Sequence, residues 1–237
     1  DLYGYEAQRS IVFDNTRSFV EGKRANNLLL YGDRGTGKSA TVKAVCRAFA
    51  ERGLKLIEVR KRDLLHFERI AETLAGRGLR FVLFIDDLSF EETDDTFTGL
   101  KALLEGGLEQ RPENVVLYAT SNRRHLVKER FADRPTTTAV AEALESGDVR
   151  AFDTMQEQLS LADRFGVTVV FSAPGQDEYL AIAEAIAEQR GLLGTEQDRT
   201  KFRQDALRWE RWFNGRSPRT AHQYVEWLAG GERFPWE

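Results

Sequence analysis

Residues 32–39 read Gly-Asp-Arg-Gly-Thr-Gly-Lys-Ser, which matches the G-x-x-x-x-G-K-S spacing of a phosphate-binding loop. An apolar run at residues 28–31 precedes the loop and a helix-like stretch follows it. In this context backbone N–H groups turn inward around a β-phosphate, Lys38 reaches the β/γ oxygens, and the Ser39 hydroxyl is placed to bind Mg²⁺. The motif predicts a nucleoside triphosphate site. Its expected nucleotide-binding residues are Gly32, Asp33, Arg34, Gly35, Thr36, Gly37, Lys38, Ser39 and Ala40.

Short apolar runs alternate with amphipathic stretches along the first 171 residues. The runs predict a five-stranded parallel sheet flanked by helices, with strands at residues 28–31, 54–59, 81–85, 115–120 and 167–171. The strands then stop, and a Ser-Ala-Pro-Gly segment precedes three helical patterns at residues 177–190, 196–213 and 217–228. We therefore expect an α/β nucleotide-binding core over residues 1–173 and a small all-helical lid domain over residues 174–237.

Polar residues follow two of the expected strands. Asp86 and Asp87 end the apolar run at residues 81–85, which is the arrangement that a Walker B motif uses to hold Mg²⁺ beside a phosphate loop. We assign Asp86 to the metal and Asp87 to the water that attacks the γ-phosphate. Asn122 ends the next strand, where its amide can hydrogen-bond that water or the γ-phosphate.

Composition narrows the class of protein. The formal net charge of -4 and a pI near 5.6 do not indicate nucleic-acid binding, although a local basic face remains compatible with them. No apolar run approaches the roughly 20 residues of a membrane span, so we expect a cytoplasmic protein with no membrane partner.

Cys46 has no thiol partner and is expected to be a small buried residue, and the three histidines lack the spacing of a zinc site. The chain begins with Asp1 rather than Met, so we expect an upstream region.

The order of these motifs resembles an AAA+ ATPase over essentially the whole chain. Tyr3, Gly4 and Tyr5 lie in a segment that resembles the one that cups adenine in that superfamily. Arg164, in Ala-Asp-Arg-Phe-Gly, resembles its arginine finger, and Arg219, in Gly-Arg-Ser-Pro-Arg-Thr-Ala, resembles the sensor 2 arginine of its lid. More closely, the strings GDRGTGKS, FIDDLSFEE, YATSNRRHL and LADRFG resemble the bacterial group called domain of unknown function 815, a set of predicted ATPases.

The resemblance implies a core sheet in the AAA+ order, a lid that folds back over the nucleotide, and assembly into a ring or partial ring. Arg164 would then act in trans, on the γ-phosphate bound by a neighbouring subunit. Arg130, which also precedes a Phe, is the second choice for this role.

Two regions differ from better-known branches of the superfamily. The segment at residues 59–63 is basic and lacks the aromatic-glycine pore loop of protein-threading machines. A long connection separates Asn122 from Arg164, with a helix expected at residues 139–145. Its basic start would meet water, nucleic acid, or a neighbouring subunit's acidic loop around residues 91–95. Late in the chain, Trp209 and Trp212 are expected in the core of the lid.

These observations predict a Mg²⁺-dependent ATPase module, homo-oligomeric, that couples nucleotide state to conformational change or assembly on an unknown macromolecular partner. The alternative is a slow nucleotide-dependent switch or loader that acts on DNA or a DNA-bound protein. A small-molecule kinase uses the same phosphate loop, but it would have a substrate pocket in its lid. The expected catalytic residues are Asp87, Asn122, Arg164 and Arg219, the expected metal ligands are Ser39 and Asp86, and the expected cofactors are ATP and Mg²⁺.

Overall fold

The structure, a computed structural model, describes residues 2–88, 104, 112–122, 164–213 and 215–236. The described elements follow one another in the order α1 (Glu6–Val20), β1 (Leu28–Gly32), α2 (Lys38–Ala48), η1 (Ala50–Arg52), β2 (Leu54–Glu58), η2 (Lys61–His66), α3 (Phe67–Leu74), β3 (Arg80–Ile85), β4 (Val115–Asn122), β5 (Val167–Phe171), α9 (Gln176–Gln189), α10 (Glu196–Trp212) and α11 (Pro218–Gly230). All five predicted strands and all three predicted C-terminal helices are present, with ends within two residues of the expected ones.

The five strands form one parallel sheet in the order β2-β3-β4-β1-β5. In this order β1, which leads into the phosphate loop, lies between β4 and β5. The strand after the Asp pair, β4, separates β1 from β3. The carboxyl ends of neighbouring parallel strands meet at one edge of a sheet, where α/β folds bind their ligands. The predicted α/β fold class is confirmed.

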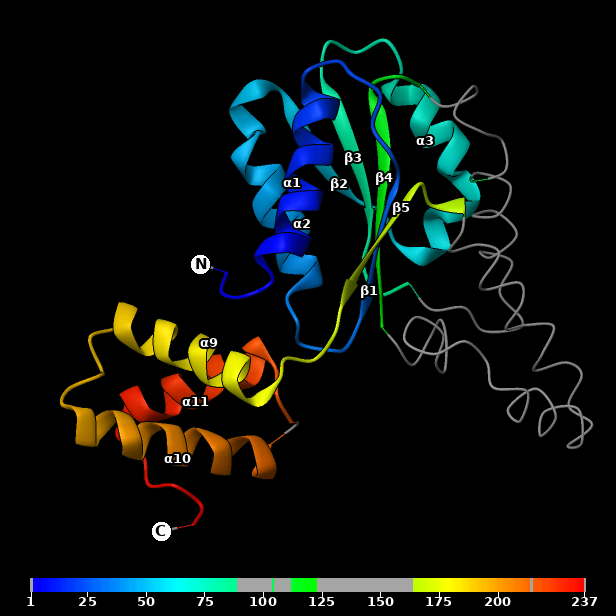
Figure 1. The fold of residues 1–237 in the computed structure, drawn as a ribbon. Helices are drawn as coiled ribbons and strands as arrows, with labels where there is room; N and C mark the ends of the chain where they lie inside the picture. The colour runs from blue at the N-terminus through cyan, green and yellow to red at the C-terminus, as the bar shows by residue number, and fades with distance from the viewer. Residues whose placement is uncertain (1, 89–103, 105–111, 123–163, 214, 237) are drawn as a thin grey trace, which may run out of the picture.

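Helices cover both faces of the sheet (Figure 1). Leu28 and Leu30 of β1 pack on the face covered by α1 and α2, whereas Leu29 and Tyr31 pack on the face covered by α3. Successive side chains of a strand point to opposite faces, so a strand that is buried on both faces reads as a continuous apolar run. Burial on both faces explains why the strands could be predicted from apolar runs in the sequence. Cys46 is also buried, and burial raises the pKa of its thiol to about 12.

The helices α9, α10 and α11 enclose a separate apolar cluster that contains Tyr179, Trp209 and Tyr224. Two N-terminal caps fix where these helices begin: the Thr195 hydroxyl accepts from Asp198 N in a capping box, and the Ser217 hydroxyl accepts from Thr220 N ahead of Pro218. The division of the chain into two domains at residue 173 stays a prediction.

One expectation about this helical part is wrong. Trp209 belongs to the apolar cluster, but Trp212 is 61% exposed. Trp212 is the last residue of α10, and its ring lies 6.5 Å from that of Trp236 near the end of the chain. The spacing of three residues predicts that Trp209 and Trp212 share one face of a helix. Trp212 is nevertheless exposed, and it lies where the helix ends.

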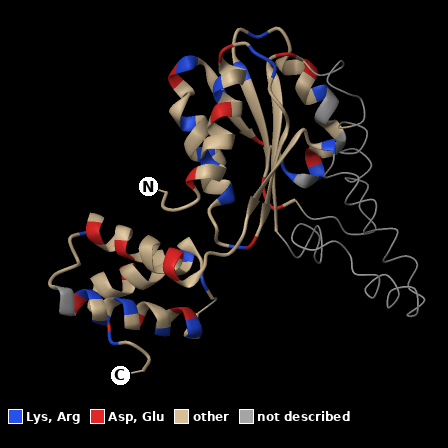
Figure 2. Ribbon diagram, viewed as in Figure 1, with Lys and Arg blue, Asp and Glu red and all other residues tan. Residues whose placement is uncertain are grey.

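Several sequence predictions lie outside the described residues. They are the acidic loop around residues 91–95, the basic start of the long connection, the helix at residues 139–145 and Arg130. In the part of the chain that the structure covers, Lys and Arg are mixed with Asp and Glu along the helices (Figure 2). No helix formed by the described residues has the length and apolar composition needed to cross a membrane.

Candidate nucleotide site

A cleft of about 630 Å³ lies at the carboxyl edge of the sheet, between the core and α11. Most of the residues predicted from the sequence line it: Tyr3, Gly4, Tyr5, Arg34, Gly35, Thr36, Gly37, Lys38, Ser39, Ala40, Asp86, Asp87, Asn122 and Arg219. Gly32, Asp33 and Arg164 do not line it. The structure therefore brings together parts of the chain that are far apart in sequence, and it leaves three predicted residues outside the cleft.

The phosphate loop leaves the sheet at Gly32, where no other residue fits. Gly32 has a φ of 138°, and a Cβ on it would lie 2.1 Å from the carbonyl oxygen of Phe171 in β5. Asp33 then donates its N–H to that oxygen at 2.9 Å, and its carboxylate accepts from Ala173 N at 2.7 Å. The Asp33 side chain thus points to the connection between β5 and α9 rather than into the cleft, although its carbonyl still contributes to the site.

Lys38, the first residue of α2, is buried with only 7% of its surface exposed. An ammonium group carries three N–H donors, and the Lys38 Nζ has three acceptors within 3.2 Å. They are the carbonyl oxygens of Gly32 and Asp33, at 3.1 and 2.6 Å, and Asn122 Oδ1 at 3.2 Å. The positive charge is held at the centre of the loop and in contact with the end of β4.

Burial lowers the pKa of Lys38 from its usual 10.5 to about 8. The negative charges of Asp33, Asp87 and Asp86 oppose this change, while the positive charge of Arg219 adds to it. Desolvation is the largest cause, because moving an ammonium group out of water disfavours its charged form. The positive charge of Lys38 is therefore held largely out of water at the phosphate loop, which suits an anionic ligand.

Asp86 directly follows β3 and lies beside the start of α2. Its Oδ1 accepts hydrogen bonds from the Ser39 hydroxyl and the Thr120 hydroxyl, each at 2.6 Å. Mg²⁺ takes oxygen ligands and is usually held by one or two carboxylates together with phosphate oxygens and waters. The adjacent Ser39 and Asp86 oxygens fit this donor set. No group of three or more His, Cys, Asp or Glu residues among those described could hold a metal by itself.

Asp87 adopts a left-handed backbone conformation, with a φ of 55°. Aspartate tolerates this region better than most residues, but the conformation still carries strain for any residue with a Cβ. Its N–H donates to the Thr120 hydroxyl at 2.9 Å, and its Oδ1 accepts from the Asn122 side-chain amide. Asn122 thus contacts both Asp87 and Lys38, so the Asp pair, the amide and the ammonium group form one connected network.

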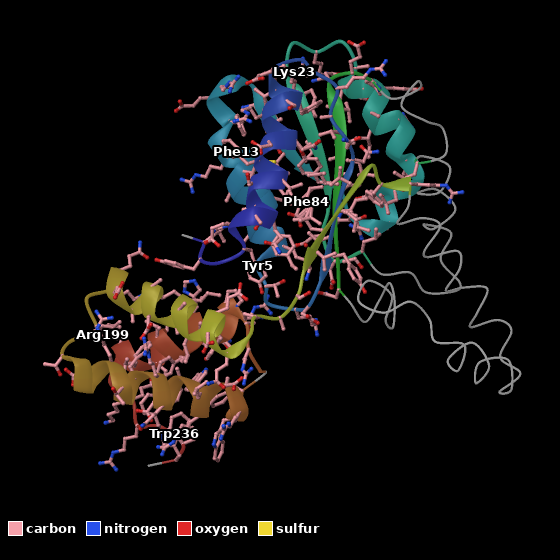
Figure 3. All side chains as sticks on the ribbon, viewed as in Figure 1. Tyr5, Phe13, Lys23, Phe84, Arg199 and Trp236 are labelled. Atoms are coloured by element: carbon pink, nitrogen blue, oxygen red, sulfur yellow. The ribbon has the colours of Figure 1, made fainter. Side chains whose placement is uncertain are left out.

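Tyr3, Gly4 and Tyr5 form the wall of the cleft at the start of α1. The Tyr5 hydroxyl donates to the Ser172 carbonyl at 2.6 Å, and its ring packs on Phe171 at 5.2 Å, at the end of the core nearest the C-terminal helices (Figure 3). A Cβ on Gly4 would lie 3.0 Å from Ile182 of α9. This segment therefore contacts both the core and the helical part, and its position at the nucleobase stays a prediction.

The N-terminus of α11 approaches the phosphate loop closely. Arg219 N donates to the Gly35 carbonyl at 3.3 Å, and a Cβ on Gly35 would lie 2.8 Å from the Ser217 hydroxyl oxygen. Gly35 has a φ of 77°, so both its backbone conformation and this contact require glycine. The contact puts Arg219 at the edge of the cleft, within electrostatic range of Lys38.

Arg164 lies at the other end of the sheet. It comes three residues before β5, and Val167, the first residue of β5, pairs with Leu28 at the start of β1. The phosphate loop leaves from the opposite end of β1, four residues further on, which corresponds to about 13 Å along a strand. Arg164 is therefore separated from its own chain's cleft by the length of the sheet.

Sequence reasoning missed several residues that line the cleft: Thr41, Lys43, Thr120, Pro218 and His222. Leu2 and Arg9, which also line it, are the first and last residues of the segment that resembles the adenine-binding one. Thr120 carried a usable signal, because it precedes Asn122 by two residues and residues two apart share one face of a strand. His222 follows Arg219 by three residues on α11, which places both on the same side of a helix. His222 also lies 6.1 Å from Tyr3, ring to ring, and burial is the main cause that lowers its pKa.

Comparison with known proteins identifies relatives in sequence and in fold. The model of the family described as "Protein of unknown function (DUF815)" matches residues 1–232. The AAA domain of FIGL-1 in complex with ADP has a TM-score of 0.52 at 15% identity, over 89% of this chain and 70% of that one. AMPPCP-bound DnaA from Aquifex aeolicus has a TM-score of 0.54 at 14% identity, over 97% of this chain and 62% of that one.

A second structure of the replication initiator DnaA, bound to AMPPCP and single-stranded DNA, has a TM-score of 0.57 at 14% identity. It is matched over 97% of this chain and 63% of that one, so this chain spans less than two thirds of both DnaA chains. At such identities the likeness shows the fold, which confirms the predicted AAA+ architecture. No curated protein matches the chain.

The lowered pKa of Lys38 predicts a pH-dependent stability in the absence of nucleotide. The unfolded chain binds this proton more tightly than the folded chain between pH 8 and 10.5, so the free energy of unfolding should rise with pH across that window. Between pH 7 and 10 the wild type should gain on the order of 2 kcal/mol relative to Lys38→Met, which lacks the titrating group. Urea unfolding of both proteins at several pH values measures the difference.

Lys23→Met is the matched control, because the Lys23 side chain is 69% exposed. Its difference from the wild type should stay constant over the same pH range. A wild-type advantage over Lys38→Met that does not grow with pH would mean that the Lys38 ammonium group is solvated.

Proposed function

The chain belongs to the family described as "Protein of unknown function (DUF815)" and has the fold of AAA+ ATPases, and we propose that it binds ATP with Mg²⁺ and hydrolyses it. One observation carries this proposal. The phosphate loop, two carboxylates, an amide and a lid arginine, from four separate parts of the chain, line one cleft at the carboxyl edge of the sheet. Such convergence of two cations, a carboxylate pair and an amide supports phosphoryl transfer to water.

The proposed roles follow from the contacts. Lys38 and the backbone N–H groups of the loop bind the β- and γ-phosphates, and Ser39 and Asp86 hold Mg²⁺, which neutralises phosphate charge when bound. Asp87 orients the attacking water and accepts its proton. Asn122, in contact with Lys38 and Asp87, positions the γ-phosphate relative to that carboxylate.

We further propose that a core of residues 1–173 and a lid of residues 174–237 move relative to each other with the state of the nucleotide. Arg219 supports this role, since it belongs to α11 but lines the cleft and is bonded through its backbone to Gly35. A change of charge at the phosphates would alter their electrostatic attraction for the Arg219 guanidinium group. Such movement is how the module would act on a macromolecular partner.

Arg164 is proposed to act on the nucleotide of a neighbouring copy of the chain. The strand register supports this assignment, because Arg164 lies near the amino end of β5 while its own phosphate loop lies at the carboxyl edge. A homo-oligomer, as a ring or partial ring, would bring one chain's Arg164 to another chain's cleft. The guanidinium would then stabilise charge on the transferred phosphoryl group.

A second candidate function is a slow switch or loader on DNA. The likeness to a DnaA structure that contains single-stranded DNA favours this possibility. The mixture of positive and negative residues along the described helices does not add to this support (Figure 2). Turnover measured with and without single-stranded DNA separates the two functions, because a DNA switch would change its rate when DNA is added.

Asp86 and Asp87 should behave differently when each is changed to Asn. Asp87→Asn should keep affinity for Mg·ATP but lower turnover by ~10²-fold or more, because an amide accepts no proton from water. Asp86→Asn should also weaken Mg²⁺-dependent binding, because it removes the negative charge beside Ser39. Phosphate release and calorimetric titration of both variants test this. Equal loss of binding in the two would mean that both carboxylates serve the metal and neither acts on water.

Arg164→Ala should lower turnover by ~10³-fold while leaving ATP affinity nearly intact, because an arginine finger acts on the transition state. Mixing tests whether it acts in trans. Lys38→Ala chains, which cannot use their own site, should restore activity to Arg164→Ala chains by supplying the arginine. Activity per wild-type chain should also rise with protein concentration. If mixed assemblies form but stay inactive, and activity is independent of concentration, Arg164 is structural.

A further inference from the structure

Thr120 lies in β4 between the phosphate loop and the Asp pair, and it is only 2% exposed. Its partner in β1 is Leu30, and the preceding residue of β4, Ala119, pairs with Ile85 at the end of β3. The register thus carries Thr120 alongside Asp86, the first residue after β3. Thr120 is among the residues that line the cleft.

This single hydroxyl bonds to both carboxylate residues. It donates to Asp86 Oδ1 at 2.6 Å and accepts from Asp87 N at 2.9 Å. The directions are fixed by chemistry, because a backbone N–H can only donate and an ionised carboxylate can only accept. The hydroxyl therefore has its proton committed to Asp86 and a lone pair committed to Asp87.

The bond to Asp87 N supports a backbone turn that would otherwise be disfavoured. Asp87 has a φ of 55°, in the left-handed region that residues with a Cβ rarely adopt. The same turn is closed by two further bonds to β4, from Leu88 N to the Thr120 carbonyl and from the Ser121 hydroxyl to the Leu88 carbonyl, each at 2.7 Å. Of these contacts, those of the Thr120 hydroxyl are the ones that reach Asp86 and Asp87 themselves.

The bond to Asp86 orients the carboxylate. Asp86 Oδ1 accepts from Ser39 and Thr120 at equal distances, so the oxygen is held between the start of α2 and the middle of the sheet. A group that hydrogen-bonds to a metal-binding carboxylate fixes the direction of the carboxylate's lone pairs. Removing such a group typically lowers metal affinity or activity by roughly 10- to 100-fold.

We propose that Thr120 is a positioning residue for this site: its hydroxyl holds the Asp86 carboxylate against Ser39 and fixes the turn that points Asp87 at Asn122. In this role Thr120 acts through Asp86 and Asp87, to which its hydroxyl is hydrogen-bonded. The inference rests on the proposed function, because it assigns a purpose to the geometry of the Asp pair only if that pair serves Mg²⁺ and ATP.

Thr120→Val tests the inference, since valine has nearly the shape of threonine but no hydroxyl. Thr120→Ser keeps the hydroxyl and is the conservative rescue. Thr16→Val is the matched control, because Thr16 is also fully buried but its hydroxyl bonds to Val12 O and the Tyr118 hydroxyl, away from the cleft. Thermal unfolding of each variant shows that it is folded, and Thr120→Ala replaces Thr120→Val if the valine variant does not fold.

The main readout is binding of a non-hydrolysable ATP analogue by the full chain, titrated with Mg²⁺ and repeated in EDTA. Thr120→Val should raise the Mg²⁺ concentration at half-maximal binding by about 10- to 100-fold. Affinity in EDTA should stay unchanged, because Lys38 is intact, and Thr120→Ser and Thr16→Val should match the wild type. In turnover assays Thr120→Val should lower kcat with little change in KM.

An unchanged Mg²⁺ midpoint and unchanged kcat in Thr120→Val would overturn the inference and leave the proposed function standing. A loss shared by Thr16→Val would also overturn it, because it would reflect only the removal of a buried hydroxyl. A wild-type chain that binds the analogue with Mg²⁺ but hydrolyses no ATP would refute the proposed hydrolysis, while the Mg²⁺ midpoint would still decide the role of Thr120. A wild-type chain that binds no nucleotide would refute both.

Discussion

The place of β1 in the sheet, between β4 and β5, is the constraint on which the rest of the site depends. The phosphate loop continues β1, so its neighbours are set by the neighbours of that strand. On one side β4 brings Thr120 and Asn122 to the loop. On the other side β5 leads into the helical part, and Asp33 bonds both to Phe171 at the end of β5 and to Ala173 just beyond it. One strand order thus joins the phosphate loop to the Asp pair and to the C-terminal helices.

In this arrangement two residues of the site, Lys38 and Asp87, are held in states that lower the stability of the folded chain. Lys38 is buried with a lowered pKa, and Asp87 has a left-handed backbone. Both lie in the same network with Asn122, where their charges and hydrogen bonds face one cleft. Sites that stabilise developing charge gain from fixed dipoles and charges that do not have to reorganise, and such sites are often less stable than an apolar core of the same size. The cost at Lys38 and Asp87 is consistent with a site built to bind phosphate.

The sequence was sufficient for the strands and for most of the cleft, because each depended on a local pattern. Buried parallel strands read as apolar runs, and the phosphate loop and the Asp pair each occupy consecutive residues after a strand. The direction of the Asp33 side chain was not predictable, since its partner Ala173 is 140 residues away in the sequence. The spacing of two residues could have placed Thr120 on the same face of its strand as Asn122, but its bonds to Asp86 and Asp87 depend on the register between β3 and β4. Helical spacing likewise could not show that Trp212, the last residue of α10, is exposed.

The central claim is that this cleft binds ATP through Lys38, and calorimetric titration of ATP into the full chain tests it most directly. The account predicts one nucleotide bound per chain, with higher affinity when Mg²⁺ is present, and no detectable binding by Lys38→Ala. Removing the ammonium leaves the β/γ-phosphate charge without its principal countercharge from a side chain. Unchanged affinity of Lys38→Ala for Mg·ATP, or no binding by the wild type, would contradict the account.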